Sequence, residues 1–151
     1  MGFLATVHCR LTREMTTPDE NGESASTQKE NITGLYEGSV SVQNGIVFLR
    51  YEGPDGFGCT VSFSKADPGI ITLCQRFGEE ADTMTLVLEE GRRHICINKT
   101  SETQLEITAC GHHIRNNIRK NGKLLLVYTT ELHGFCVEKT TMALSIHKIE
   151  K

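Results

Sequence analysis

The stretch Gly91-Arg92-Arg93-His94 places two arginines and a histidine shortly after two glutamates, Glu89 and Glu90. Guanidinium groups bind carboxylates and phosphates through paired hydrogen bonds, and an imidazole titrates near neutral pH. Apolar and polar residues alternate directly after this stretch, so we expect it at the start of a strand. We interpret it either as a site for the anionic head group of a ligand or as a solvated strand edge.

A second cluster, Gly111-His112-His113, places two histidines side by side. Neighbouring residues on a strand point to opposite faces, so the pair cannot easily chelate one metal ion. The alternation of apolar residues also changes phase beside Gly111, which predicts a β-bulge that could alter these directions. We expect surface or wall histidines here and no metal site.

Four cations with no acid among them, Arg115, Arg119, Lys120 and Lys123, form a local basic patch. No aromatic residue lies between them to stack on nucleic-acid bases. The patch indicates a solvated turn or, as the alternative, a surface that binds RNA or an acidic partner.

The sequence lacks the motifs of several large enzyme classes. It has no Gly-x-Ser-x-Gly, no Walker loop and no His-Glu-x-x-His. Cysteines, histidines and acids are present, but no spacing marks them as nucleophile, base and orienting group. We therefore expect no catalytic residues and no cofactor, and we favour a protein that is not an enzyme.

The chain of 151 residues is long enough for one domain with a sizeable core. Its net charge is −3, and residues 18–31 carry all of it, which makes nucleic acid an unexpected partner. The N-terminus has no signal-peptide pattern, and no apolar run is long enough to span a bilayer, so no membrane association is expected. The six cysteines are interpreted as reduced thiols of a cytoplasmic protein, whose oligomeric state stays open.

Short alternating runs separated by turn residues occur along the chain, and no dozen residues keep helical spacing. Asn44-Gly45 lies between two apolar runs and predicts a type I′ hairpin turn. In the last run, Met142, Leu144 and Ile146 share one parity, which predicts one dry face. The run 124–127 is apolar at both parities, so we expect it in mid-sheet, covered on both faces.

Residues 18–31 hold Ala25 as their only hydrophobic residue and are predicted to be a mobile polar loop. The alternating run 4–12 must cross this loop to pair with the main body. About eight to ten hairpin-linked strands in one domain hide their edges best by closing. The prediction for residues 1–151 is therefore a single all-β antiparallel barrel.

Three stretches in order, LYEGSVSVQNGIVFLRYEG, TMTLVLEEGRRH and LEITACGHHIRNNIRKNGKLLLVYTTELHG, resemble the bacterial YwiB-like family, the calycin-like domain of unknown function 1934. The resemblance covers roughly residues 32–149. Its most specific part is a Gly-x-Arg-His corner, matched by Gly91, Arg93 and His94. A Thr-Pro-Tyr-Gly turn follows in the family; Thr100 fits its first position, and the next three residues differ.

The resemblance implies a calycin-like barrel, related in shape to lipocalins and fatty-acid-binding proteins, and no established activity. We predict a non-enzymatic binding protein for a small, partly apolar or anionic ligand, with Arg93, His94 and Thr100 as binding residues. The alternatives are an interaction module that binds nucleic acid or a protein through the basic turn, and an enzyme that uses His94. An open cavity in the barrel would favour the ligand binder, and a filled interior would favour the interaction module.

Overall fold

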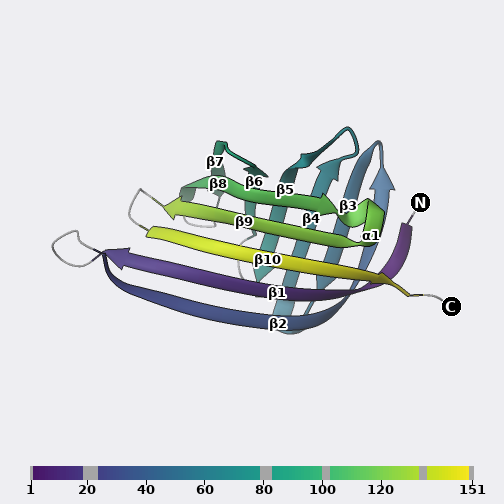
Figure 1. Cartoon of the computed structure of the whole chain (residues 1–151), viewed down its shortest axis with the longest axis horizontal. Helices are drawn as coiled ribbons and strands as arrows, with labels where there is room; N and C mark the ends of the chain where they lie inside the picture. Colours follow the sequence, from purple (N-terminus) through teal and green to yellow (C-terminus); the bar gives the residue numbers. More distant parts are fainter. Residues whose placement is uncertain (1, 19–23, 79–82, 100–102, 133–135, 150–151) are drawn as a thin grey trace.

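The computed structural model describes residues 2–18, 24–78, 83–99, 103–132 and 136–149. Within these ranges the chain forms ten antiparallel strands and almost no helix (Figure 1), which confirms the all-β prediction. No helix in these ranges is long and apolar enough to cross a bilayer. The elements are β1 (Gly2–Pro18), β2 (Ser24–Gln43), β3 (Ile46–Glu52), η1 (Pro54–Gly56), β4 (Phe57–Ser64), β5 (Asp67–Phe77), β6 (Met84–Glu89), β7 (Arg93–Lys99), β8 (Gln104–Asn117), α1 (Ile118–Asn121), β9 (Lys123–Leu132) and β10 (Cys136–Lys148).

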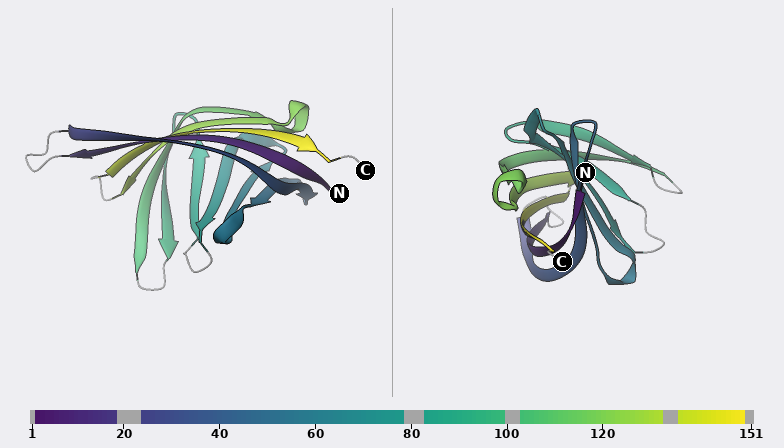
Figure 2. Two further views of the ribbon diagram at one scale, coloured as in Figure 1. Left: turned by 90° about the horizontal axis from the view of Figure 1, so that it is seen from below. Right: turned by 90° about the vertical axis from the view of Figure 1, so that its right-hand side faces the viewer.

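The ten strands form one sheet in the order β6-β5-β4-β3-β2-β1-β10-β9-β8-β7. Strands adjacent in the chain pair with one another, except at the step from β6 to β7. The first and last strands pair instead, from Ala5 opposite Lys148 to Thr16 opposite Val137. The sheet curls into a nearly closed barrel (Figure 2), which confirms the predicted calycin-like architecture. Its two edges therefore meet in mid-chain, between β6 and β7.

Alternate side chains of the strands fill much of the barrel interior, as the period of two requires. Met142, Leu144 and Ile146 on β10 are buried as predicted. On β9, Leu124 and Leu126 are buried, whereas Leu125 and Val127 are only partly covered. β9 lies in mid-sheet as expected, but the prediction of two covered faces is wrong, because no element of the described residues packs over its outer face. The five cysteines whose side chains are described are free thiols.

Two predicted turns show how far local sequence determines the chain path. Asn44 and Gly45 have φ angles of 53° and 78°, the left-handed values of a type I′ turn, so this prediction is confirmed. The residues Asp67-Pro68-Gly69 are typical of a turn and predict one there. The turn lies instead at Lys65 and Ala66, and β5 begins at Asp67. Pro68 is compatible with this strand start because pairing of β5 with β6 begins only at Ile70.

Strand β2 begins at Ser24, so much of the stretch predicted as a loop over 18–31 is strand instead. β1 and β2 form a long ribbon that reaches beyond the neighbouring strands (Figure 1). Cross-strand polar contacts support it: Lys29 lies 3.8 Å from Glu14, and Thr12 donates a hydrogen bond to Asn31 at 3.0 Å. Residues 28–31 of β2 are exposed and therefore need no apolar side chains, which is why composition alone suggested a loop. Residues 19–23 lie outside the described residues.

The bulge predicted beside Gly111 is present in β8, where the register with β9 shifts between Gly111 and His113. A Cβ atom at Gly111 would lie 2.7 Å from the backbone oxygen of Glu89. The amide of Gly91 donates to the Gly111 oxygen at 2.8 Å. The bulge and the missing side chain thus let the turn between β6 and β7 lie directly on β8.

Candidate functional site

One end of the barrel holds a partly open cavity of about 340 Å³, lined by residues of β1, β5, β6, β8, β9 and β10. We call it the barrel cavity. Hydrophobic side chains form most of its wall, so an apolar part of a ligand would lose water-exposed surface on entering. The lining residues are Leu11, Arg13 and Met15 of β1; Gln75 of β5; Met84 and Leu86 of β6; Leu105 and Ile107 of β8; Tyr128, Thr130, Glu131 and Leu132 of β9; and Glu138 and Thr140 of β10.

An ion pair lies at the polar side of the barrel cavity. Arg13 Nε lies 3.2 Å from Glu138 Oε1, and both side chains are about a quarter to a third exposed, at 30% and 25%. Thr140 donates a hydrogen bond to the same carboxylate oxygen at 3.4 Å. The pair joins β1 to β10, two neighbours in the sheet that come from opposite ends of the chain. Charged and hydrogen-bonding groups are therefore within reach of a bound molecule.

Two uncharged polar side chains complete this side of the cavity. Burial raises the pKa of the Tyr128 hydroxyl, and a hydrogen bond with Thr140 opposes that shift. The hydroxyl is therefore neutral at physiological pH. Gln75 from β5 is also buried. Neutral donors and acceptors of this kind fix the orientation of a ligand without demanding a particular charge.

A second hollow of about 380 Å³ lies beside the barrel cavity and is lined by the β1–β2 ribbon and Glu138. Arg13, Met15 and Glu138 line both spaces. The Arg13–Glu138 pair thus lies between the interior of the barrel and the ribbon.

The opposite wall of the barrel contains the join between β6 and β7, which we call the seam. Among the described residues these strands share no backbone ladder, and side chains of β7 take its place. Asn98 accepts a hydrogen bond from the Thr85 amide at 2.7 Å and donates to the Thr85 oxygen at 3.2 Å. Further along, the amide of Val87 donates to the sulfur of Cys96 at 3.4 Å.

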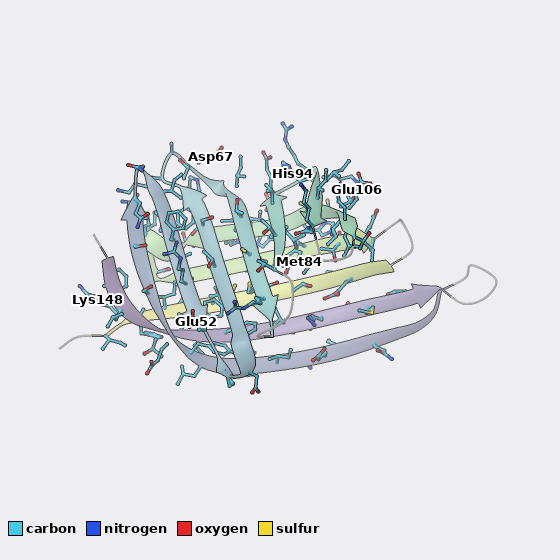
Figure 3. The ribbon with its side chains drawn as sticks, turned by 180° about the vertical axis from the view of Figure 1, so that it is seen from behind. Glu52, Asp67, Met84, His94, Glu106 and Lys148 are labelled. Atoms are coloured by element: carbon cyan, nitrogen blue, oxygen red, sulfur yellow. The ribbon has the colours of Figure 1, made fainter. Side chains whose placement is uncertain are left out.

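His94 makes the third contact of the seam, through a hydrogen bond from Nε2 to Glu89 Oε1 at 3.0 Å. The three contacts join Asn98 to Thr85, Cys96 to Val87 and His94 to Glu89. β6 and β7 therefore run antiparallel along the seam. Met84, which lines the cavity, and His94 lie apart along this seam (Figure 3). His94 therefore faces inward but contributes to closing the barrel, and it is not among the cavity-lining residues.

Arg93 points to the outside of the barrel. Its Nη2 atom lies 2.8 Å from Glu131 Oε2 on β9, and its side chain is 62% exposed. It is paired with an acid and does not line the barrel cavity. Thr100, the third residue proposed from the family resemblance, lies outside the described residues. The binding roles of Arg93, His94 and Thr100 remain predictions.

The two neighbouring histidines of β8 have separate partners. His112 lies 2.9 Å from the Thr129 hydroxyl, whereas His113 accepts a hydrogen bond from Arg115 and lies 3.5 Å from Glu90. Across the described residues no three His, Cys, Asp or Glu side chains are grouped to hold a metal ion. The structure thus gives each histidine a local polar contact.

Sequence reasoning overlooked Arg13, Glu138 and Thr140, although a signal was present. Glu138 and Thr140 share the parity of the buried Met142 and Leu144, so they place polar groups on the dry face. Arg13 breaks the apolar run of β1 in the same way. A charged side chain on the inward-facing side of a strand needs a partner of opposite charge or access to water. Here Arg13 and Glu138 are each other's partners.

Comparison with known proteins agrees with this fold. The family model described as "Domain of unknown function (DUF1934)" matches residues 20–144. The chain belongs to this family. The crystal structure of the ywiB protein from Bacillus subtilis is similar, with a TM-score of 0.55 and 18% identity over 99% of this chain and 94% of that one. At this identity the likeness shows the fold alone. Curated proteins gave no match.

Proposed function

We propose that this DUF1934 protein binds a small, partly apolar molecule in the barrel cavity and has no catalytic role. The main support is the cavity itself, because a space of about 340 Å³ is at the lower end of the range of small-molecule sites. Its combination of apolar walls and a few polar groups on one side is typical of such sites. The lining contains Glu, Thr and Tyr but none of His, Cys or Ser, which favours binding over nucleophilic catalysis.

The charges of the lining suggest which head group the ligand carries. Arg13 and Glu138 are the charged lining residues of inward parity, whereas the third, Glu131, has the outward parity of β9. Arg13 is already paired with Glu138, and Glu131 is paired with Arg93. An anionic head group would have to displace a carboxylate from Arg13, which costs the free energy of that pair. We therefore favour a neutral hydroxyl or amide, or a cation, over the anion that the sequence suggested.

Three molecules with the same alkyl chain test this proposal: 1-octanol, octylamine and octanoate. A ligand that binds only the folded protein raises its melting temperature. We expect 1-octanol or octylamine to raise the Tm more than octanoate does. No shift with any of the three would count against the cavity as a binding site for this class of molecule. A larger shift with octanoate would reverse the assignment of the head group.

A pair of tryptophan variants places the bound molecule. Leu105→Trp puts a large side chain at the cavity wall, and Glu106→Trp puts the same side chain on the opposite, exposed face of β8. The Tm shift should disappear in Leu105→Trp and persist in Glu106→Trp. Circular dichroism of the two unliganded variants checks that both remain folded. Equal shifts in both variants would place binding elsewhere.

The alternative of an enzyme that uses His94 has less support. His94 is held by Glu89 in the seam and does not line the cavity. The alternative of binding through the basic turn rests on a different part of the molecule.

A further inference from the structure

The basic turn contributes to a hollow at the other end of the barrel. The hollow has a volume of about 320 Å³, and we call it the basic hollow. Figure 1 shows α1 at the end of β8 and β9 that is remote from the tip of the β1–β2 ribbon. The lining residues are Phe63, Lys65, Pro68, Asn116, Arg119 and Lys120. It shares no residue with the barrel cavity, so it is a separate site.

Two turns that are distant in sequence form the basic hollow, and hydrogen bonds connect them. Asn116 Nδ2 donates to the Pro68 oxygen at 3.0 Å, which links the end of β8 to the start of β5. The same side chain accepts a hydrogen bond from the Ile118 amide at 3.2 Å, and Ile118, the first residue of α1, is buried. The amide of Lys65 donates to Gly45 at 2.9 Å. The backbone that carries the cations is therefore held in place before any ligand arrives.

The three cations of the hollow have no acidic partner within the described part of the chain. Lys65, Arg119 and Lys120 form no salt bridge there, and no acidic residue lines the hollow. Arg92 and Arg93, by contrast, are each close to a glutamate. The nearest acid in sequence is Asp67, which lines the neighbouring hollow over β4 and β5; Figure 3 shows it at the β4–β5 turn. The basic hollow thus gathers uncompensated positive charge.

The uncharged residues of the hollow indicate which class of anion fits. Pro68 is exposed and supplies an apolar surface, Phe63 lies beneath it at 4% exposure, and Asn116 supplies an amide. A phosphoryl group carries up to two negative charges and several acceptor oxygens, which suit one guanidinium and two ammonium groups. An apolar or ring-containing group attached to the phosphate would cover Pro68. Long nucleic acid fits less well, because the whole chain has a net charge of −3.

We infer that the basic hollow binds the phosphoryl group of a small organic phosphate, with Lys65, Arg119 and Lys120 as the anion-binding residues. The inference is independent of the ligand proposed for the barrel cavity. Phosphate is the shared chemistry of a free nucleotide and an RNA chain, and the experiment distinguishes these sources.

Isothermal titration calorimetry tests the inference with four probes: adenosine 5′-monophosphate, adenosine, inorganic phosphate and a single-stranded RNA dodecamer. We expect binding of adenosine 5′-monophosphate that weakens as salt rises, because ion pairs are screened. Adenosine should not bind, and inorganic phosphate should bind more weakly than the nucleotide. Absence of nucleotide binding at millimolar concentration, or equal affinity for inorganic phosphate, would overturn the inference as stated. Much tighter binding of the RNA would also overturn it, in favour of a nucleic-acid surface.

Charge-removing variants locate the site. Arg119→Gln and Lys120→Gln should each weaken nucleotide binding roughly tenfold, because the loss of one hydrogen bond between charged groups raises a dissociation constant by about tenfold or more. Lys123→Gln is the matched control, because Lys123 is an exposed cation of the same turn that does not line the hollow. All three positions are exposed, so each variant should fold. Equal weakening by Lys123→Gln would show a diffuse charge effect and overturn the assigned site.

Discussion

Asn98 contacts both backbone groups of Thr85, accepting from its amide at 2.7 Å and donating to its carbonyl at 3.2 Å. One side-chain amide thus reproduces the two hydrogen bonds that a paired residue of a β-ladder would make. The contact lies at the seam, where β6 and β7 share no ladder among the described residues. With Cys96 and His94, it joins the two edges of the sheet through side chains.

Replacing Asn98 by aspartate should destabilise the protein by about 1–3 kcal/mol, because the carboxylate cannot donate to the Thr85 carbonyl and Asn98 is buried. Urea denaturation measures the loss. Hydrogen exchange of backbone amides along the seam should also accelerate, because the weakened contact lets the seam open more often. Lys99→Ala, at the exposed neighbouring position, is the control and should have little effect. An unchanged urea midpoint in Asn98→Asp would contradict the role of Asn98 in closing the barrel.

Gly111→Ala should destabilise the protein, because the new Cβ atom would lie 2.7 Å from the Glu89 oxygen and a backbone segment would have to move. Overpacking of this kind costs about 1–3 kcal/mol. Gly58→Ala is the matched control, since a Cβ atom there meets no heavy atom within 4 Å. Thermal melts of the two variants should therefore differ clearly. Similar melting temperatures would show that the β6–β7 turn does not depend on contact with the bulge.

Leu144→Ala should lower the free energy of unfolding by roughly 2–5 kcal/mol, because Leu144 is 3% exposed and its removal leaves a cavity. Ser145→Ala, on the opposite parity of β10, should change it by less than about 0.5 kcal/mol. Chemical denaturation of both variants compares the two faces of one strand. Equal losses would mean that the assigned faces of β10 are incorrect.

Alkaline pH should weaken the fold through buried acids that lose their protons. Burial raises the pKa of the Cys59 thiol from 9.0 to about 12, and the nearby polar groups of Tyr51 and Gln75 partly oppose the shift. The unfolded chain releases this proton at lower pH than the folded chain. The stabilisation is therefore complete below about pH 9 and is lost as pH rises towards 12. Burial also raises the pKa of Tyr128 and so acts in the same direction.

Urea denaturation between pH 7 and pH 11, in the presence of a reductant, measures this dependence. The free energy of unfolding should be flat up to about pH 9 and then decrease, with a limiting slope of about 1.4 kcal/mol per pH unit for each proton involved. Cys59→Ala should make the alkaline decrease shallower. A stability that rises above pH 9 would have the wrong sign for these buried groups.

Arg93→Met should change stability by less than about 1 kcal/mol, because the Arg93–Glu131 pair is largely solvated and such pairs contribute little. It should also leave the Tm shift caused by 1-octanol unchanged. Thermal melts with and without the alcohol test both statements. If Arg93→Met abolishes the shift while the unliganded protein stays folded, Arg93 is a binding residue, as the family resemblance suggested.

The sequence alone determined which residues face inward and where several turns and one bulge lie. The alternation of Met142, Leu144 and Ile146, the positive φ angles at Asn44 and Gly45, and the change of phase at Gly111 were all predicted and are present. These features depend on properties of neighbouring residues, namely side-chain parity and local backbone sterics. Local information is sufficient for them.

Only the tertiary structure determined what meets across the barrel. Arg13 and Glu138 come from opposite ends of the chain, and Arg93 reaches Glu131 across β8. Residues 24–31 form strand because β1 provides a pairing partner, although their composition is that of a loop. Such contacts depend on the curvature of the whole sheet and on the position of the seam. No local pattern encodes these, because each arises from the pairing of all ten strands.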